Sequence, residues 1–251
     1  MKKICLFGAV GALAASCAFG AWGQLIRSFY VRPAYATGIA VMPDGYLFVS
    51  RAGFQQWYCY TTRGSLVRSY TGVGFYDGAG RCHLPGYFVV TRGSGGVWRF
   101  GYTGAGGLGP GARMPIPATG RGISWDGVYY YVTTGSWGTP VGMYTTNGSL
   151  VGTVTGPWAG SLYGHAHSRR GTGYLLCATT SPSYVYEVAV STGSATRWFA
   201  VPSTPAGADT SSADVYIYVV IPGAMSHVNV YDTDGMPVAP ASLGRVKALF
   251  R

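Results

Sequence analysis

Three of the four histidines have a spacing that suits metal binding. His165 and His167 stand two apart in a segment expected to be a strand, so both side chains point to one face. His83 lies three residues after Gly80, as His167 does after Gly164, and these glycines recur along the chain. Imidazole nitrogens bind Zn²⁺ and Cu²⁺. No carboxylate or cysteine completes a recognised ligand spacing, so we expect no metal or other cofactor and keep His83, His165 and His167 as the alternative.

The eight acidic residues leave little material for acid–base catalysis. Five lie in or beside expected hairpin turns, where Asp is favoured for backbone reasons: Asp44, Asp126, Asp214, Asp232 and Asp234. Glycosidases need two carboxylates that flank the scissile bond. Asp77 and Asp209, helped by His167, are the only such set that suits a first strand, and nothing matches a nucleophile elbow, a phosphate loop or a metalloprotease motif. A polysaccharide-cleaving glycosidase or lyase is therefore the alternative function, and we expect no catalytic residue.

Aromatic and planar polar side chains gather in the expected loops. Rings stack on the C–H faces of sugars and planar polar groups bind hydroxyls, although the same rings also pack loops or bind proteins. We expect these residues on one face of the molecule, as ligand-binding candidates: Arg51, Gln55, Trp57, Tyr76, Arg92, Arg121, Trp137, Trp158, Tyr163 and Tyr184.

Two series of glycines set the frame that positions these side chains. The first comprises Gly38, Gly80, Gly122, Gly164 and Gly207, with steps of 42, 42, 42 and 43 residues. The second runs in register with it, as Gly23, Gly64, Gly106, Gly148, Gly193 and Gly235. A repeat of this length is typical of a four-stranded propeller blade. We therefore predict an all-β, five-bladed β-propeller.

The third repeat shows the expected strands clearly. Short β-branched and aromatic runs over 122–125, 128–132, 141–144 and 149–154 alternate with turns such as Asp126-Gly127. The segment from Gly23 to Phe29 matches Gly64 to Tyr70 and so represents a fourth strand with no first three before it. We predict that this N-terminal strand completes the last blade and closes the ring, which protects sheet edges.

The ends of the chain fall outside the repeats. A basic start, an apolar run over 4–19 and small residues before Ala21 are typical of a secretory signal peptide over 1–20. We place the propeller at 21–240, with repeats near 38–79, 80–121, 122–163, 164–206 and 207–240, and residues 23–30 closing the last one. A basic, apolar tail follows over 241–251. A lipoprotein, with its lipid on Cys17 after Leu13-Ala14-Ala15-Ser16, remains the alternative to an ordinary signal peptide.

Charge and cysteine content narrow the class of partner. The chain carries 18 basic and 8 acidic residues, and loss of Lys2 and Lys3 leaves the exported chain at about +8. Its arginines are scattered through the repeats and no nucleic-acid recognition motif occurs, so we expect no nucleic-acid partner. Three cysteines remain, and an odd number leaves at least one unpaired: Cys59, Cys82 and Cys177. A pair between Cys59 and Cys82 stays open.

The short blades and Asp-Gly hairpins resemble secreted bacterial β-propellers of the NHL/YVTN-like kind over residues 23–238. This resemblance rests on turn chemistry, so it implies a fold and not an activity. We expect a secreted or cell-envelope protein with no transmembrane segment in its mature chain. Its expected role is a non-catalytic binding or structural one, in which one loop face recognises polysaccharide or an extracellular envelope protein.

Overall fold

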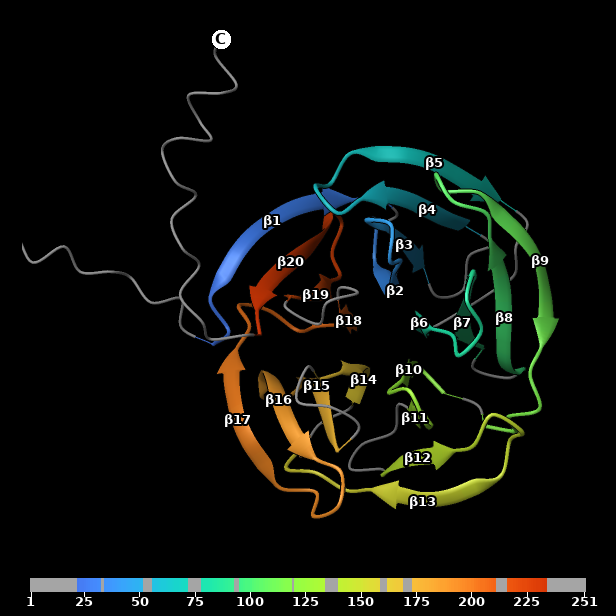
Figure 1. The fold of residues 1–251 in the computed structure, drawn as a ribbon. Helices are drawn as coiled ribbons and strands as arrows, with labels where there is room; N and C mark the ends of the chain where they lie inside the picture. Colours follow the sequence, from blue (N-terminus) through green and yellow to red (C-terminus); the bar gives the residue numbers. More distant parts are fainter. Residues whose placement is uncertain are drawn as a thin grey trace, which may run out of the picture.

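The fold is a ring of five antiparallel sheets (Figure 1). The computed structural model describes residues 22–32, 34–51, 56–71, 78–92, 95–118, 120–133, 140–158, 162–168, 173–210 and 216–233. These ranges contain twenty β-strands and no helix, and hence no helix long and apolar enough to span a membrane. The prediction of an all-β, five-bladed β-propeller is confirmed.

Each blade has four strands, and its first strand lies nearest the centre of the ring (Figure 1). Blade one contains β2 (Ala36–Val41), β3 (Tyr46–Arg51), β4 (Gln56–Thr61) and β5 (Leu66–Thr71). Blade two contains β6 (Gly78–Arg81), β7 (Tyr87–Arg92), β8 (Gly96–Tyr102) and β9 (Leu108–Arg113). Blade three contains β10 (Gly122–Trp125), β11 (Tyr130–Thr133), β12 (Val141–Tyr144) and β13 (Leu150–Val154). Blade four contains β14 (Leu162–His167), β15 (Tyr174–Thr180), β16 (Ser183–Ala189) and β17 (Ala195–Ala200). Blade five contains β18 (Gly207–Thr210), β19 (Tyr216–Ile221), β20 (Ser226–Asp232) and β1 (Leu25–Val31).

The first glycine series allows the innermost strands to approach one another closely. A Cβ atom on Gly80 of β6 would lie 2.3 Å from the carbonyl oxygen of Ile123 in β10. A Cβ atom on Gly207 of β18 would lie 2.4 Å from the carbonyl oxygen of Thr37 in β2. Both contacts are with backbone, which cannot swing aside as a side chain can. Five sheets that converge on one axis therefore need a residue without a side chain at these points.

The second glycine series makes the hairpin between the third and fourth strands of blades one to four. Gly64 has a φ of +94° and Gly148 a φ of +89°, a region that glycine enters without a steric penalty. A Cβ atom on Gly64 would also meet the Phe29 ring of the neighbouring blade at 2.6 Å. The turn chemistry and the contact between blades thus both select glycine here.

Five apolar clusters fill the five boundaries between neighbouring blades. Between blades one and two, the Phe48 and Phe88 rings stack with their centroids 4.9 Å apart, and Trp57 lies against Phe88 at 5.6 Å. All three side chains are almost fully buried. Burial of each such ring contributes about 2–3 kcal/mol relative to exposure, so these three aromatic residues hold blades one and two together.

The ring closes where β1 pairs with β20, as the sequence predicts (Figure 1). The two strands are antiparallel, with Ser28 opposite Asn229 and Tyr30 opposite His227. Two backbone hydrogen bonds extend the pairing, because Gly23 N donates to Asp232 O at 2.7 Å and Asp232 N donates to Gln24 O at 2.9 Å. Residues from the two ends of the propeller therefore share one sheet.

A buried ion pair anchors the chain just before β1. The Glu187 carboxylate is fully buried and accepts hydrogen bonds from Arg197 Nε at 2.8 Å and Arg197 Nη2 at 3.0 Å. The Arg197 guanidinium lies 4.5 Å from the centroid of the Trp22 ring, and that ring meets Phe199 edge-on at 5.0 Å. Trp22 is thus held by a cation–π contact and an aromatic contact on blade four. We refer to residues 22–31 with these partners as the clasp.

The predicted signal peptide, the tail over 241–251 and Cys17 lie outside the described residues, so the domain boundaries remain predictions. The three remaining cysteines are all free thiols, with Cys59 and Cys177 buried and Cys82 half-buried. Desolvation by burial raises the pKa of the Cys59 thiol to about 12, which keeps it protonated and unreactive at neutral pH.

Candidate functional site

The loops of one end of the ring form the candidate site. Because strands alternate in direction within each blade, connections between second and third strands lie at the same end as connections between successive blades. We call this end the loop face. The first hairpins and the hairpins between third and fourth strands lie at the opposite end.

An arginine and a tyrosine meet on the loop face. Arg51 ends β3, and its guanidinium lies 5.7 Å from the centroid of the Tyr35 ring. Tyr35 belongs to the segment that crosses from blade five to blade one, and 56% of it is exposed. Its backbone has a φ of +56°, a region that bulky residues rarely adopt. Its N–H donates to Gly223 O at 2.8 Å, which fixes the crossing segment to blade five.

Such a backbone conformation costs about 1–3 kcal/mol in a residue with a side chain, and residues of this kind concentrate at functional sites. The strain at Tyr35 holds an exposed ring beside a cation. Tyr35 is not among the ligand-binding candidates predicted from the sequence, because nothing in the residue types around it signals a positive φ. Only the Arg51 half of the pair was a candidate.

Three buried hydroxyls lie at the loop-face end of the second strands. They belong to Ser50, Thr91 and Thr133, which end or nearly end β3, β7 and β11. Each side chain is at most 3% exposed, and none of these hydroxyl oxygens has a hydrogen-bond partner among the described protein groups. A buried hydroxyl without a partner costs about 1–3 kcal/mol. In blades one to three, a buried hydroxyl therefore lies at the end of the second strand, beneath the connections of the loop face.

The other described ligand-binding candidates differ in how far their side chains are exposed. Trp57 is 2% exposed and Trp158 is 4% exposed, and both rings pack in the apolar clusters between blades. This burial makes them packing residues and gives a ligand no ring to stack on. Tyr184 is half-buried and meets Tyr186 edge-on at 5.7 Å. Arg121 is exposed beside β10, and its N–H donates to Thr133 O at 2.9 Å.

The remaining loop candidates cannot be placed. Gln55, Tyr76 and Trp137 lie outside the described residues. Arg92 and Tyr163 belong to strands β7 and β14, but their side chains are not described. The set that the structure brings to the loop face is therefore Arg51 and Arg121, with Tyr35 as an addition.

Asp209, one carboxylate of the alternative catalytic pair, is buried and binds backbone N–H groups. It is 2% exposed. Its Oδ2 accepts a hydrogen bond from Val41 N at 2.7 Å, and its Oδ1 accepts one from Thr210 N at 2.9 Å. Val41 ends β2 at the first hairpin, so this carboxylate ties blade five to blade one at the end away from the loop face. Asp77 and the side chain of His167 lie outside the part of the chain that the structure describes.

An arginine crosses the ring at that same end. Arg81 ends β6 of blade two, and its Nη2 donates to Thr210 O at 2.8 Å and lies 3.4 Å from Thr210 Oγ1. Blades two and five are separated by blade one, so this contact passes across the centre. Arg81 therefore narrows the centre of the ring at the end opposite the loop face.

The histidines are held by different partners. His83 Nδ1 lies 2.6 Å from the Tyr130 hydroxyl, and His165 Nδ1 lies 2.7 Å from the Ser124 hydroxyl. Complete burial lowers the pKa of His165 to about 3, and burial also lowers the pKa of His83. Among the described residues, no three His, Cys, Asp or Glu side chains are grouped closely enough to hold a metal ion.

Comparison with known proteins supports the architecture. The crystal structure of Myxococcus xanthus glutaminyl cyclase is similar, with a TM-score of 0.61 and 16% sequence identity over 84% of this chain and 96% of that one. At this identity the likeness shows the fold alone. No protein-family model matches the chain, and no curated protein matches its sequence.

Proposed function

We propose that this protein is an exported, non-catalytic module that binds polysaccharide through its loop face. The observation that carries the proposal is the exposed Tyr35 ring held in a strained backbone beside the Arg51 guanidinium. A ring that is kept at the surface against a conformational cost serves recognition better than packing. Export and residence in the cell envelope are part of the proposal and rest on the predicted signal peptide.

The chemistry of the loop face suits a sugar. The exposed face of Tyr35 offers a platform for the C–H side of a pyranose ring, and the Arg51 guanidinium offers fixed donors for its hydroxyls. Arg121 adds an exposed cation at the same end, in addition to the half-buried Arg51. The hydroxyls of Ser50, Thr91 and Thr133 make the floor beneath these groups polar.

The placement of the described candidate carboxylate, Asp209, favours binding of a polysaccharide without its cleavage. Hydrolysis of a glycosidic bond requires two carboxyl groups that reach the substrate. Asp209 is buried at the far end of the ring, and both its oxygens accept backbone hydrogen bonds. The Asp77 and Asp209 pair therefore gains no support from the described geometry.

A polysaccharide array tests the proposal directly. The purified mature chain, from residue 21 onward, is applied to the array, and both retention and release of fragments are scored. We expect retention without release, and we expect Arg51→Ala or Tyr35→Gly to weaken it. Arg63→Ala is the matched control, because Arg63 is an exposed arginine in a hairpin at the opposite end.

Tyr35→Gly is informative because glycine adopts the backbone conformation at this position without strain, so loss of binding reflects loss of the ring. Release of fragments would establish the cleaving enzyme instead. Absence of retention, combined with capture of an envelope protein that needs Arg51, would replace the sugar with a protein partner.

A further inference from the structure

A surface groove lies on the outer wall of the propeller where the ring closes, and neither Arg51 nor Tyr35 lines it. It consists of two hollows of about 450 Å³ each that share Tyr30 and Met225. One hollow reaches Tyr60 of blade one, and the other reaches His227 of blade five. Each volume falls within the range of about 300–1,000 Å³ that small-molecule sites occupy. We call the two hollows together the seam groove.

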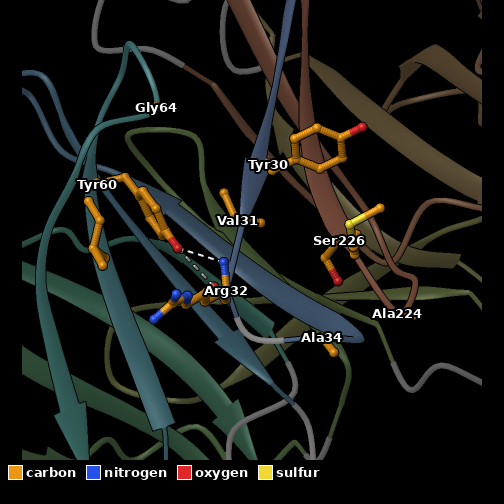
Figure 2. Close-up of a pocket in the computed structure, with 10 residues that line it drawn as sticks. Tyr30, Val31, Arg32, Ala34, Tyr60, Gly64, Ala224 and Ser226 are labelled. Carbon is orange, nitrogen blue, oxygen red and sulfur yellow. Dashed lines mark hydrogen bonds between the residues drawn. The ribbon is translucent and has the colours of Figure 1, made fainter.

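Tyr30 is the central side chain of the groove and is highly exposed. The ring is 70% exposed, and the neighbouring Met225 is 73% exposed. Figure 2 shows Tyr30 and Tyr60 on opposite sides of the end of β1, with Val31 between them. The Tyr30 ring meets the His227 ring edge-on at 6.3 Å, which steadies it on one side. Both rings of this pair come from the two strands that close the ring.

The aromatic residue is peculiar to this blade. Tyr30 lies seven residues after Gly23, a glycine of the second series. Seven residues after the equivalent glycines of blades one to four stand Thr71, Arg113, Thr155 and Ala200. The fold therefore accepts a small residue at this position of the outer strand. A large exposed ring at the closing blade is not required by the repeat and needs another reason.

The charge of the groove is positive. Arg32 is exposed and follows Tyr30 by two residues, and neither hollow is lined by an aspartate or glutamate. The backbone N–H of Arg32 donates to the Tyr60 hydroxyl at 2.5 Å, which fixes the start of its side chain (Figure 2). A guanidinium binds a carboxylate through paired hydrogen bonds.

We propose that the seam groove binds an acidic polysaccharide, with Tyr30 stacking on a pyranose ring and Arg32 binding its carboxylate. The apolar Met225 side chain extends the platform beside Tyr30, and the His227 ring supplies a further polar edge. This site borders the loop face, because Ala34 and Met225 lie in connections at that end, but it includes neither Arg51 nor Tyr35 and does not depend on that pair binding sugar. It commits to uronic acid residues, because their carboxylate forms charge-assisted hydrogen bonds with the Arg32 guanidinium that a neutral sugar does not offer.

Titration of the full mature chain with trigalacturonic acid, monitored by NMR, tests the site. Maltotriose serves as the neutral comparison. We expect trigalacturonic acid to bind more tightly than maltotriose, Tyr30→Thr to weaken its binding about tenfold, and Arg32→Gln to remove the preference for the acidic sugar. Tyr30→Thr introduces the residue that blades one and three carry at this position, so the fold should be kept.

Two controls separate this site from others. Trp198→Thr removes a ring that is 59% exposed on β17, outside the groove, and should leave binding unchanged. Arg51→Ala should also leave it unchanged, so failure of the loop-face proposal is distinguishable from failure of this one. Equal affinity for the two trisaccharides, or no effect of Tyr30→Thr, would overturn the proposal. Self-association that Tyr30→Thr abolishes, without sugar binding, would assign the groove to a second copy of the chain and equally overturn it.

Discussion

Acid should destabilise this protein through one buried histidine. His165 is fully buried between blades three and four, where its Nδ1 lies 2.7 Å from Ser124 Oγ. Its Nε2 is also buried and has no partner among the described groups. Desolvation lowers its pKa from 6.5 to about 3, so the folded protein keeps the ring neutral. An imidazolium there would be a buried charge without a counter-ion.

The sign and size of the effect follow from proton linkage. Below pH 6.5 the unfolded chain takes up a proton that the folded chain refuses until about pH 3. Stability is therefore complete above pH 6.5 and falls as the pH drops towards 3. One pKa unit corresponds to about 1.4 kcal/mol, so this group alone should remove about 2 kcal/mol between pH 8 and pH 5.

Denaturant unfolding at pH 8 and pH 5 measures this loss, and His165→Asn isolates it. Asparagine keeps a polar atom near the position of Nδ1 and does not titrate. The variant should lose about 2 kcal/mol less than the wild type between the two pH values. His83, whose pKa is also lowered, contributes equally to both proteins and cancels from the difference.

A second measurement covers the case in which the variant does not fold. Titration of the imidazole signals of the wild type by NMR should show one ring that stays neutral throughout the folded range down to pH 4. Equal losses for variant and wild type, or a His165 ring that titrates near 6.5, would refute the reasoning.

Three further perturbations test how the ring is held. Deletion of residues 21–30 should lower the melting temperature sharply, because it leaves blade five with three strands; an unchanged midpoint would contradict closure by the clasp. Arg197→Ala removes the positive charge beside the buried Glu187 carboxylate, which keeps hydroxyl donors from Ser168 and Thr196, and a loss of about 3 kcal/mol in denaturant unfolding is expected. Gly80→Ala should cost more than about 1 kcal/mol, because its Cβ would press on the Ile123 carbonyl 2.3 Å away. An alanine variant as stable as wild type would mean that the inner strands can move apart.

The repeats were predictable from the sequence because the recurring residues are selected by the local backbone conformation of each turn. Hairpins that need a positive φ select glycine wherever they occur, so Gly64 and Gly148 mark the same turn in different blades. The strands Gly122–Trp125 and Val141–Tyr144 have the predicted bounds, and each leads into a tight turn, at Asp126-Gly127 and at Thr145 to Gly148. The second strand of that blade begins at Tyr130, two residues later than predicted, because Asp126 accepts from the N–H groups of Val128 and Tyr129 and so extends the turn.

The candidate site was predictable only in part, because repeat position does not report burial. Trp57 and Trp158 stand in the right regions of their repeats, but their rings fill the boundaries between blades. Tyr30 and Tyr35 gain their surroundings from ring closure, which brings His227 and Gly223 beside them from the far end of the chain. A comparison of repeats at Tyr30, where other blades carry smaller or charged residues, was the one signal available in advance.

The distribution of charge joins the two binding proposals. Four of the five described acidic residues are buried, where they fix turns or hold blades: Asp126, Glu187, Asp209 and Asp232. No described arginine is buried. Over the described residues the surface is therefore more positive than their net charge suggests, because most of their negative charges are buried. A basic surface of this kind, with exposed rings at Tyr35 and Tyr30, favours a polyanionic partner over a neutral one. Acidic polysaccharide satisfies both features, since it offers carboxylates to the arginines and pyranose faces to the rings.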